Sequence, residues 1–337
     1  MRKSVLNLAV LLVLALVLGS SAGTPPHAIA DEWTRVFVNG QLVPVRFNDG
    51  DSFRVQGGPL SGSQCRLGGF NTLESFGPAH QWGDWHPYEL FVIAKQALAN
   101  GRRGTWHCTT DGNRDGYGRL LMDCPDLAMS HISQGFAMAY MVDDSPTRPE
   151  YIRAQREAIE NRRGMWAHGV PDYVMTSVHS ADEDPSREHH YNRLISTHDG
   201  HSESMQHNDT YAECAWVCND EIRADESAVE AGARRVREDA TLATLAADVP
   251  NYQLLEMVRR YARLGELPAY TPPALAEPLR ARLASERASG QLGTTRTEQG
   301  SCMIAVPFGR WYGRERASCL RGHGTAPDGT RWSHASH

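Results

Sequence analysis

Seven cysteines follow an N-terminal segment with the features of an export signal, and this combination strongly limits the folds open to the chain. Arg2 and Lys3 precede a largely apolar run over residues 5–18, and small residues follow at 19–22. A basic start, a short apolar stretch and a small-residue cleavage site are typical of a secretory signal peptide. The run is short for an uncleaved anchor that spans a bilayer. We therefore expect residues 1–30 to be cleaved, and the mature chain to be secreted or periplasmic, with no stable membrane association. Disulfides can form in that compartment.

The first closely spaced pair of cysteines predicts a hairpin bridge. Cys108 and Cys124 flank a polar, glycine-rich stretch over residues 111–118, so they would face each other across a turn. If the four cysteines that follow pair among themselves, Cys65 is left without a partner, and we expect it to be a buried free thiol.

The other four cysteines predict two further bridges. Cys214 and Cys218 are spaced i,i+4, which indicates one face of a helix, and Cys302 and Cys319 lie far downstream. We expect the first two to be joined to the last two, in an order that the spacing leaves open. A zinc site built from the same four thiolates is the alternative.

The charge balance excludes some classes of protein. The chain has 34 basic and 40 acidic residues, a net charge of −6, and 41% hydrophobic residues. This argues against a basic nucleic-acid packing protein and against wholesale disorder. Lys3 and Lys95 are the only lysines, so anion recognition would depend on arginine, whose planar fork suits phosphate oxygens.

Local patterns divide the chain into two parts. Short β-type runs separated by glycine turns fill residues 33–125, with one helix expected over Tyr88–Ala99. Two more helices are predicted over Asp126–Gln134 and after Thr147, where the Thr147-x-x-Glu150 spacing suggests a capping box. The fold class expected for residues 31–175 is therefore α+β.

The composition changes near residue 176. Residues 176–208 are polar and contain six histidines, and we expect them to form a loop-like linker. From residue 209 to about 288 the chain is rich in alanine, arginine, glutamate and leucine, and a short β-like piece follows over Cys302–Cys319. Residues 209–337 are therefore predicted to form a mainly helical domain tied by disulfides, with a function that the sequence does not indicate.

Residue types suited to phosphodiester cleavage occur in the β-rich part. Arg66 and Arg119 could bind a phosphate whose negative charge grows in the transition state. Glu74 could orient an attacking water or take its proton. Asp51, in the tight turn Asp49-Gly50-Asp51, could bind a hard divalent cation through its carboxylate.

The order and spacing of these motifs resemble the staphylococcal-nuclease-like family, over residues 33 to 170. Fifteen residues separate Asp51 from Arg66, eight separate Arg66 from Glu74, and forty-five separate Glu74 from Arg119. The resemblance implies a five-stranded OB-type β-barrel with three helices. It also implies a calcium ion bound in part by the Thr72 backbone carbonyl, and Tyr117 lining the substrate site.

The activity implied by this resemblance is Ca²⁺-dependent, endonucleolytic hydrolysis of DNA and RNA to 3′-phosphate products. Glu74 would be the general base, and Arg66 and Arg119 would stabilise the transition-state phosphate. The protein partners of the chain are not indicated.

Three positions depart from the family pattern. Asn71 stands where the family has a second metal-binding aspartate, Leu73 replaces a proline, and Gly116 replaces a basic residue. An amide oxygen still binds Ca²⁺, so Asn71 remains a candidate ligand, with the loss of one charge weakening the site. A weak or inert OB-type module that binds nucleic acid or another anion is the alternative function.

The downstream part offers two further possibilities. His198, His201, Glu203 and His207 could bind zinc or another transition metal, or could be ordinary solvated loop residues. A third hypothesis gives residues 209–337 the main task, for instance surface attachment, with the nuclease-like part as its effector.

Overall fold

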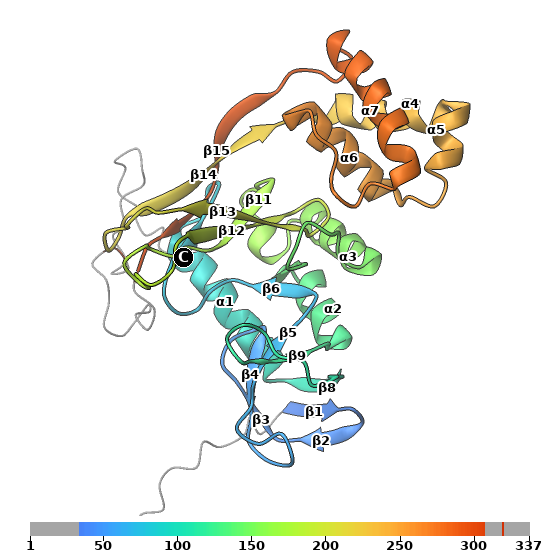
Figure 1. The fold of residues 1–337 in the computed structure, drawn as a ribbon. Coiled ribbons are helices and arrows are strands. Elements are labelled where there is room, and N and C mark those ends of the chain that lie inside the picture. The colour runs from blue at the N-terminus through green and yellow to red at the C-terminus, as the bar shows by residue number, and fades with distance from the viewer. Residues whose placement is uncertain (1–33, 307–318, 320–337) are drawn as a thin grey trace, which may run out of the picture.

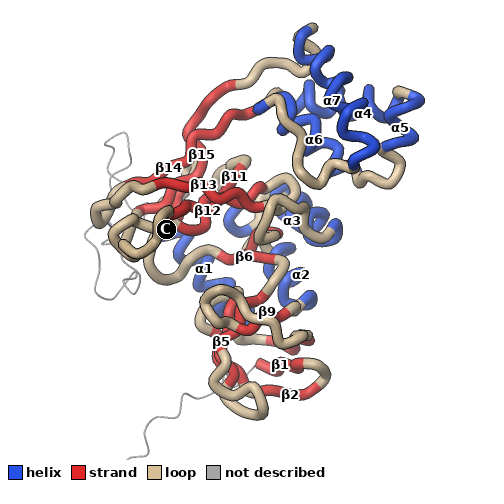
Figure 2. The backbone as a smooth tube through the Cα atoms, in the orientation of Figure 1, coloured by secondary structure: helices blue, strands red, loops and turns tan. Residues whose placement is uncertain are grey.

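The computed structural model describes residues 34–306 and Cys319, so the expected signal peptide lies outside the described residues. The described chain is mixed α+β, as expected, with seven α-helices, one short 3₁₀ helix and fifteen strands in five small sheets (Figures 1 and 2). It divides into a β-rich body and a helical bundle at one end (Figure 2).

The first part of the body contains ten strands and three helices. They are β1 (Thr34–Val38), β2 (Gln41–Val43), β3 (Val45–Phe47), β4 (Ser52–Val55), β5 (Gln64–Leu67), β6 (Phe70–Thr72), β7 (Ala79–Gln81), α1 (Pro87–Gly101), β8 (Gly104–Cys108), β9 (Leu120–Met122), α2 (Pro125–Ser133), β10 (Ala137–Ala139) and α3 (Pro149–Glu160). The 3₁₀ helix Gly164–Trp166 follows. The hydrogen-bonded sheets are β2-β1-β8, β3-β4-β5-β9 and β10-β6, and within residues 34–306 they do not close into a barrel.

The helices begin where local chemistry allows. At α1 the His86 side chain accepts from the backbone of the first turn, Glu89 reaches back to His86 N, and Pro87 needs no hydrogen-bond acceptor there. The capping box predicted at Thr147 is wrong, because α3 has Arg148 as its N-cap residue and no side chain caps it. The Thr147 hydroxyl instead donates to the Tyr140 carbonyl.

One hydrophobic core lies between the first sheets and α2 and α3, and a second joins α1 to the following part of the chain. The first includes Val36, Phe47, Phe53, Leu67, Trp106, Leu120 and Tyr151. The second includes Leu73, Trp82, Leu90, Trp166, Val174 and Ile195. Trp166 is fully buried against Trp82, so it packs the segment after α3 against the rest of this core.

The second part of the body consists of two sheets. Its strands are β11 (Tyr173–Ser177), β12 (His190–Ser196), β13 (Ser202–His207), β14 (Trp216–Arg223) and β15 (Arg296–Ile304), in the orders β11-β12-β13 and β14-β15-β7. Because β7 belongs to the first part, the second sheet joins both parts of the body.

The expected loop-like linker over 176–208 is wrong in conformation, because β12 and β13 lie within it. Asn192 shows how a polar side chain of β12 is buried with partners. It donates to the Tyr211 hydroxyl at 2.9 Å and accepts from His207. A polar composition therefore did not indicate a solvated loop here.

The helix expected at Cys214 and Cys218 is also wrong. Cys218 lies in β14 directly opposite Cys302 of β15, and these two form a disulfide. Cys214, in a left-handed backbone conformation (φ 71°), is bonded to Cys319. The Cys108–Cys124 bridge and the buried free thiol of Cys65 are confirmed. The three disulfides fit an oxidising, extracytoplasmic environment.

The helical bundle is inserted between β14 and β15. Its helices are α4 (Glu226–Glu238), α5 (Ala240–Leu245), α6 (Asn251–Leu264) and α7 (Pro273–Ala288), and the two long strands lead into and out of it (Figure 1). The bundle has its own core, which includes Val229, Leu254, Val258, Leu275, Leu279 and Leu283. Among the helices of the described residues, none is long and apolar enough to span a membrane.

Candidate functional site

The turn Asp49–Asp51 between β3 and β4 is held from two sides. A Cβ atom on Gly50 would lie 2.5 Å from Thr72 Cγ2 and 2.7 Å from Ala97 Cβ, so this close approach requires glycine. On the other side, the His131 side chain of α2 donates from Nε2 to the Gly50 carbonyl at 3.0 Å. The turn therefore has a defined position relative to β6 and α2.

Asp51 lies at the centre of a buried polar network. Its Oδ2 accepts from the Thr72 backbone N at 2.8 Å and from the Thr72 hydroxyl at 3.1 Å. Its Oδ1 forms an ion pair with the Arg66 guanidinium, which the β4–β5 register brings opposite Ser52. Burial alone would raise the pKa of Asp51, but the charge and hydrogen bond of Arg66 outweigh burial and hold this pKa below its ordinary value.

Asn71 joins this network from β6. Its Oδ1 accepts from Arg66 Nη2 at 2.5 Å, and its Nδ2 donates to the Thr72 carbonyl at 2.8 Å. The Asn71 amide thus orients Arg66. It also donates a hydrogen bond to the Thr72 carbonyl, the oxygen that the family resemblance assigns as a calcium ligand.

Glu74 follows β6 and is half-buried. Burial, and next the negative charges of Asp51 and Asp49, raise the pKa of Glu74 to about 8, although Arg66 and Arg119 act in the opposite direction. The same causes, burial and the charge of Asp51, raise the pKa of Asp49 to about 7. Both carboxyl groups therefore hold a proton more readily than exposed ones, and a positive ion or a basic group near them would lower their pKa values.

His80 of β7 holds the backbone beside this carboxylate. The Glu74 backbone N donates to His80 Nε2 at 2.9 Å, so Nδ1 carries the proton and donates to the Met175 carbonyl at 3.0 Å. No spacing in the sequence indicated His80 or His131, because their bonds to the Met175 and Gly50 carbonyls join segments far apart in the chain.

Arg119 and Tyr117 lie on the loop between β8 and β9. Asp115 Oδ2 accepts from Arg119 Nε at 2.7 Å, and Asp115 Oδ1 accepts from the backbone N atoms of Tyr117 and Arg119. The Arg119 guanidinium lies 5.5 Å from the centroid of the Tyr117 ring, which is 64% exposed. Asp115 therefore fixes the conformation of this loop and the orientation of the Arg119 guanidinium.

A cavity of about 700 Å³ is lined by three of the predicted site residues, Glu74, Tyr117 and Arg119. One wall carries Asp49, Ser52, Glu74, Tyr117 and Arg119. The opposite wall was not foreseen, since it comes from β11, β15 and the segments beside them: Thr176, Ser177, Val178, His179, Glu183, Met303 and Val306. Asp51, Arg66, Asn71 and Thr72 lie behind the first wall, within their hydrogen-bonded network.

The atoms around Asp51 have the chemistry that a hard cation such as Ca²⁺ prefers. Carboxylate, backbone carbonyl and amide oxygens are present, and burial, followed by the charge of Asp51, raises the pKa of Asp49. Asn71 Oδ1 is bonded to Arg66, however, which leaves Asp51 and the Thr72 carbonyl as the better candidates. Over the described residues, no group of three or more His, Cys, Asp or Glu side chains has an arrangement that could hold a metal ion.

The histidine side chains of residues 176–208 are not arranged as a zinc site requires. His201 is fully buried between Asp199 Oδ1 at 2.5 Å and Glu203 Oε1 at 3.3 Å, while His207 Nε2 bonds to Asn192. These side chains form polar pairs within β12, β13 and the turn between them.

Comparison with known proteins adds no assignment: no protein-family model matches the chain, and none of the curated proteins matches it significantly.

Proposed function

We propose that this protein is a Ca²⁺-dependent phosphodiesterase of the staphylococcal-nuclease type that cleaves DNA and RNA. The observation that carries the proposal is the cavity in which Glu74, with its raised pKa, lies together with Arg119 and Tyr117 and in front of the Asp51–Arg66 pair. These are the residue types that phosphodiester hydrolysis requires, and distant segments of the chain supply them.

In the proposed reaction, water attacks phosphorus and the 5′ oxygen leaves, so that the phosphate stays on the 3′ side. Glu74 in its ionised form takes the proton from the attacking water, and its raised pKa makes this carboxylate a stronger base than an exposed glutamate, with the ionised form increasing as the pH approaches about 8. Arg119, aimed by Asp115, and Arg66, aimed by Asp51 and Asn71, bind the phosphate oxygens as their charge grows. The leaving oxygen takes up a proton from solvent.

Ca²⁺ would be held by Asp51 and the Thr72 carbonyl, with Asn71 as a weaker ligand, and it would supply positive charge to the phosphate. The Asn71 amide donates to that carbonyl, so we expect weaker Ca²⁺ binding than an aspartate would give at this position.

The finer fold and the cellular location are part of the same proposal. The core shared by β1, β3, β4, β5, β8 and β9 supports an OB-type arrangement, although the sheets are separate. The disulfides support a secreted or periplasmic protein.

One observation favours the second candidate, a binding module without activity. Asn71 accepts a hydrogen bond from Arg66 and donates one to the Thr72 carbonyl. These bonds occupy the Asn71 Oδ1 atom and the Thr72 carbonyl oxygen, for which a metal ion would have to compete. In that case the cavity would bind nucleic acid without cleaving it.

The test is the cleavage of plasmid DNA, single-stranded DNA and RNA by the oxidised mature protein, with Ca²⁺ or with EGTA, beside the Glu74→Gln variant. Glu183→Gln is the matched control, because this carboxylate lies on the opposite cavity wall. We expect Ca²⁺-dependent cleavage that falls by about 10²–10⁴-fold in Glu74→Gln.

Each other outcome has a distinct meaning. Cleavage that is insensitive to EGTA would retain the nuclease and reject the calcium site. Binding of DNA without cleavage, across several divalent ions, would favour the binding module. Equal loss in both variants would reject Glu74 as the specific base.

A further inference from the structure

Strand β12, in the sheet β11-β12-β13, carries arginine and tyrosine side chains near the cavity. Tyr191 and Arg193 lie two residues apart in β12 and so share one face of the strand. The Arg193 guanidinium lies 5.3 Å from the centroid of the Tyr191 ring. Its Nη1 donates to the Val142 carbonyl and to the Ser202 hydroxyl, each at 3.1 Å, so its position is defined.

Tyr191 lies near residues that line the cavity. Tyr191 lies close enough to Tyr117 to raise the pKa of the Tyr117 phenol, while Arg187 acts on this pKa in the opposite direction. The His179 ring, on the opposite wall, packs edge-on against Tyr191 at 5.3 Å. Tyr191 therefore joins two residues that line the cavity.

Two tyrosine rings with an arginine at each end lead from the loop before β9 to β12. Arg119 lies against Tyr117, Tyr117 against Tyr191, and Tyr191 against Arg193. On the inner side, Arg66 lies 5.8 Å from the Tyr140 ring. Aromatic rings that stack bases, interleaved with arginines that bind phosphates, are typical of sites for single-stranded nucleic acid.

Acidic residues near this surface fix the orientation of its basic side chains. Asp184 accepts from Arg187 Nε at 2.9 Å, and Glu183 lies 3.4 Å from His179 Nδ1. Arg187 is exposed, with 45% of its side chain accessible, so a phosphate could reach its guanidinium.

We propose that Tyr191, Arg193, Arg187 and Tyr117 form a subsite for the nucleotides of a single strand next to the scissile phosphodiester. The inference rests on the proposed function and adds a binding surface from β12, which lies outside the part of the chain that resembles a nuclease. Tyr117 and Tyr191 stack on bases, and Arg187 and Arg193 bind the flanking phosphates.

The experiment measures equilibrium binding of a fluorescein-labelled oligothymidylate by anisotropy, with Ca²⁺, in the full mature chain carrying Glu74→Gln. Into this parent are introduced Tyr191→Leu, Tyr191→Phe, Arg187→Ala and, as a matched control, Arg234→Ala. Arg234 is an exposed arginine near an acidic residue, Glu230, on α4. Circular dichroism establishes that each variant is folded.

We expect Tyr191→Leu to weaken binding about tenfold, and Tyr191→Phe to restore most of the affinity because the ring remains. Arg187→Ala should flatten the slope of log affinity against log salt by about 0.7, the value for one phosphate contact on a single strand. Arg234→Ala should change neither quantity.

If Tyr191→Leu and Arg187→Ala bind with the affinity and salt slope of the parent while the wild-type protein cleaves DNA, the subsite is wrong and the nuclease stands. If the parent does not bind the oligonucleotide and the wild type does not cleave, both proposals fall. Weakened binding in the two variants without wild-type cleavage supports the subsite within a binding module.

Discussion

At the scale of single residues, two buried histidines hold the backbone beside the candidate catalytic groups. His80 accepts from the Glu74 backbone, and His131 accepts from Asn100 and donates to the Gly50 carbonyl. Burial lowers the pKa of each histidine to about 4, so each stays neutral and keeps one donor and one acceptor. This neutral form allows each ring to bridge two segments.

Asn71 is the residue at which the proposed metal site can be tested. In Asn71→Asp the new carboxylate adds a charge near the metal and no longer donates to the Thr72 carbonyl. We expect the Ca²⁺ concentration for half-maximal activity to fall about tenfold or more. Isothermal titration with Ca²⁺ measures the binding directly.

Asn192→Asp is the control for this change, because Asn192 is buried in β12 and bonded to Tyr211 and His207. It should leave the Ca²⁺ dependence unaltered. An unchanged or weaker affinity in Asn71→Asp would contradict the assignment of Asp51 and Thr72 as ligands.

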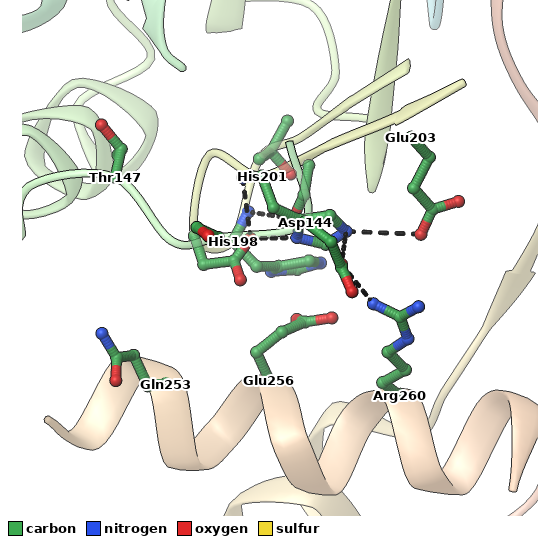
Figure 3. A network of polar contacts seen from close by, with 12 residues as sticks. Asp144, Thr147, His198, His201, Glu203, Gln253, Glu256 and Arg260 are labelled. Carbon is green, nitrogen blue, oxygen red and sulfur yellow. Dashed lines mark hydrogen bonds and ion pairs between the residues drawn. The ribbon is translucent and has the colours of Figure 1, made fainter. Parts of the chain in front are cut away.

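At the scale of elements, the strands β12 and β13 meet helix α6 through a charged junction. Figure 3 shows His201 and Glu203 above α6, with Asp144 between His201 and Arg260. Arg260 Nη1 donates to Asp144 Oδ1 at 2.6 Å, and the Tyr270 hydroxyl donates to Asp199 Oδ2 at 3.0 Å. The junction joins the helical bundle to the body.

The junction predicts a dependence of stability on pH. Burial alone would lower the pKa of His201, but the charge and hydrogen bond of Asp199 raise it to about 10. Because this lies above the ordinary value of 6.5, the stabilisation is complete below pH 6.5 and is lost as the pH rises through about 10. Between these values the free energy of unfolding should lose about 1.4 kcal/mol for each pH unit from this group.

The measurement is urea unfolding of the wild type and His201→Asn from pH 5 to pH 9. The difference between the two proteins should be largest below pH 6.5 and shrink above it. His189→Asn, at an exposed position beside Glu188, serves as control and should show no such trend. A difference for His201→Asn that is constant over the whole range would contradict a charged His201 in the folded protein.

At the scale of the whole molecule, the sheet β14-β15-β7 joins the parts of the chain. β15 pairs with β7 on one side and with β14 on the other, and the bundle α4–α7 lies between β14 and β15 in the sequence. The Ser301 hydroxyl also bridges to β11, accepting from Met175 N at 2.6 Å and donating to the Tyr173 carbonyl at 2.7 Å. The second cavity wall depends on this sheet.

The Cys218–Cys302 bridge closes a loop that contains the whole bundle, with a sequence separation of 84 residues. Replacing both cysteines by alanine should lower the free energy of unfolding by about 3 kcal/mol, because the enclosing Cys214–Cys319 bridge still restricts the unfolded chain. The paired alanine replacement of Cys108 and Cys124, with a separation of 16, is the matched comparison and should also cost about 3 kcal/mol. Urea unfolding of the oxidised proteins measures both, and a negligible loss for either pair would contradict the expectation.

Local patterns predicted the elements that local interactions stabilise. The helix expected over Tyr88–Ala99 is α1, and the one over Asp126–Gln134 is α2. The hairpin bridge Cys108–Cys124 was predictable because its cysteines are neighbours across one turn. The strands over 176–208 were missed because their buried polar residues depend on partners elsewhere, such as Tyr211 for Asn192.

The sequence by itself determined the local elements, the bridge between near cysteines, and the set of arginines and carboxylates from which a phosphodiesterase site can be built. Turn residues, periodicity and short spacings act within a few residues, so they can be recognised without the fold. Only the tertiary structure decided the pairing of β15 with β7, the partners of Cys302 and Cys319, and the contacts of His80 and His131. It also decided that residues of β11 and β15 line the cavity of the candidate site. These features depend on which distant segments pack together, and that is set by the burial of whole faces and the pairing of buried polar groups.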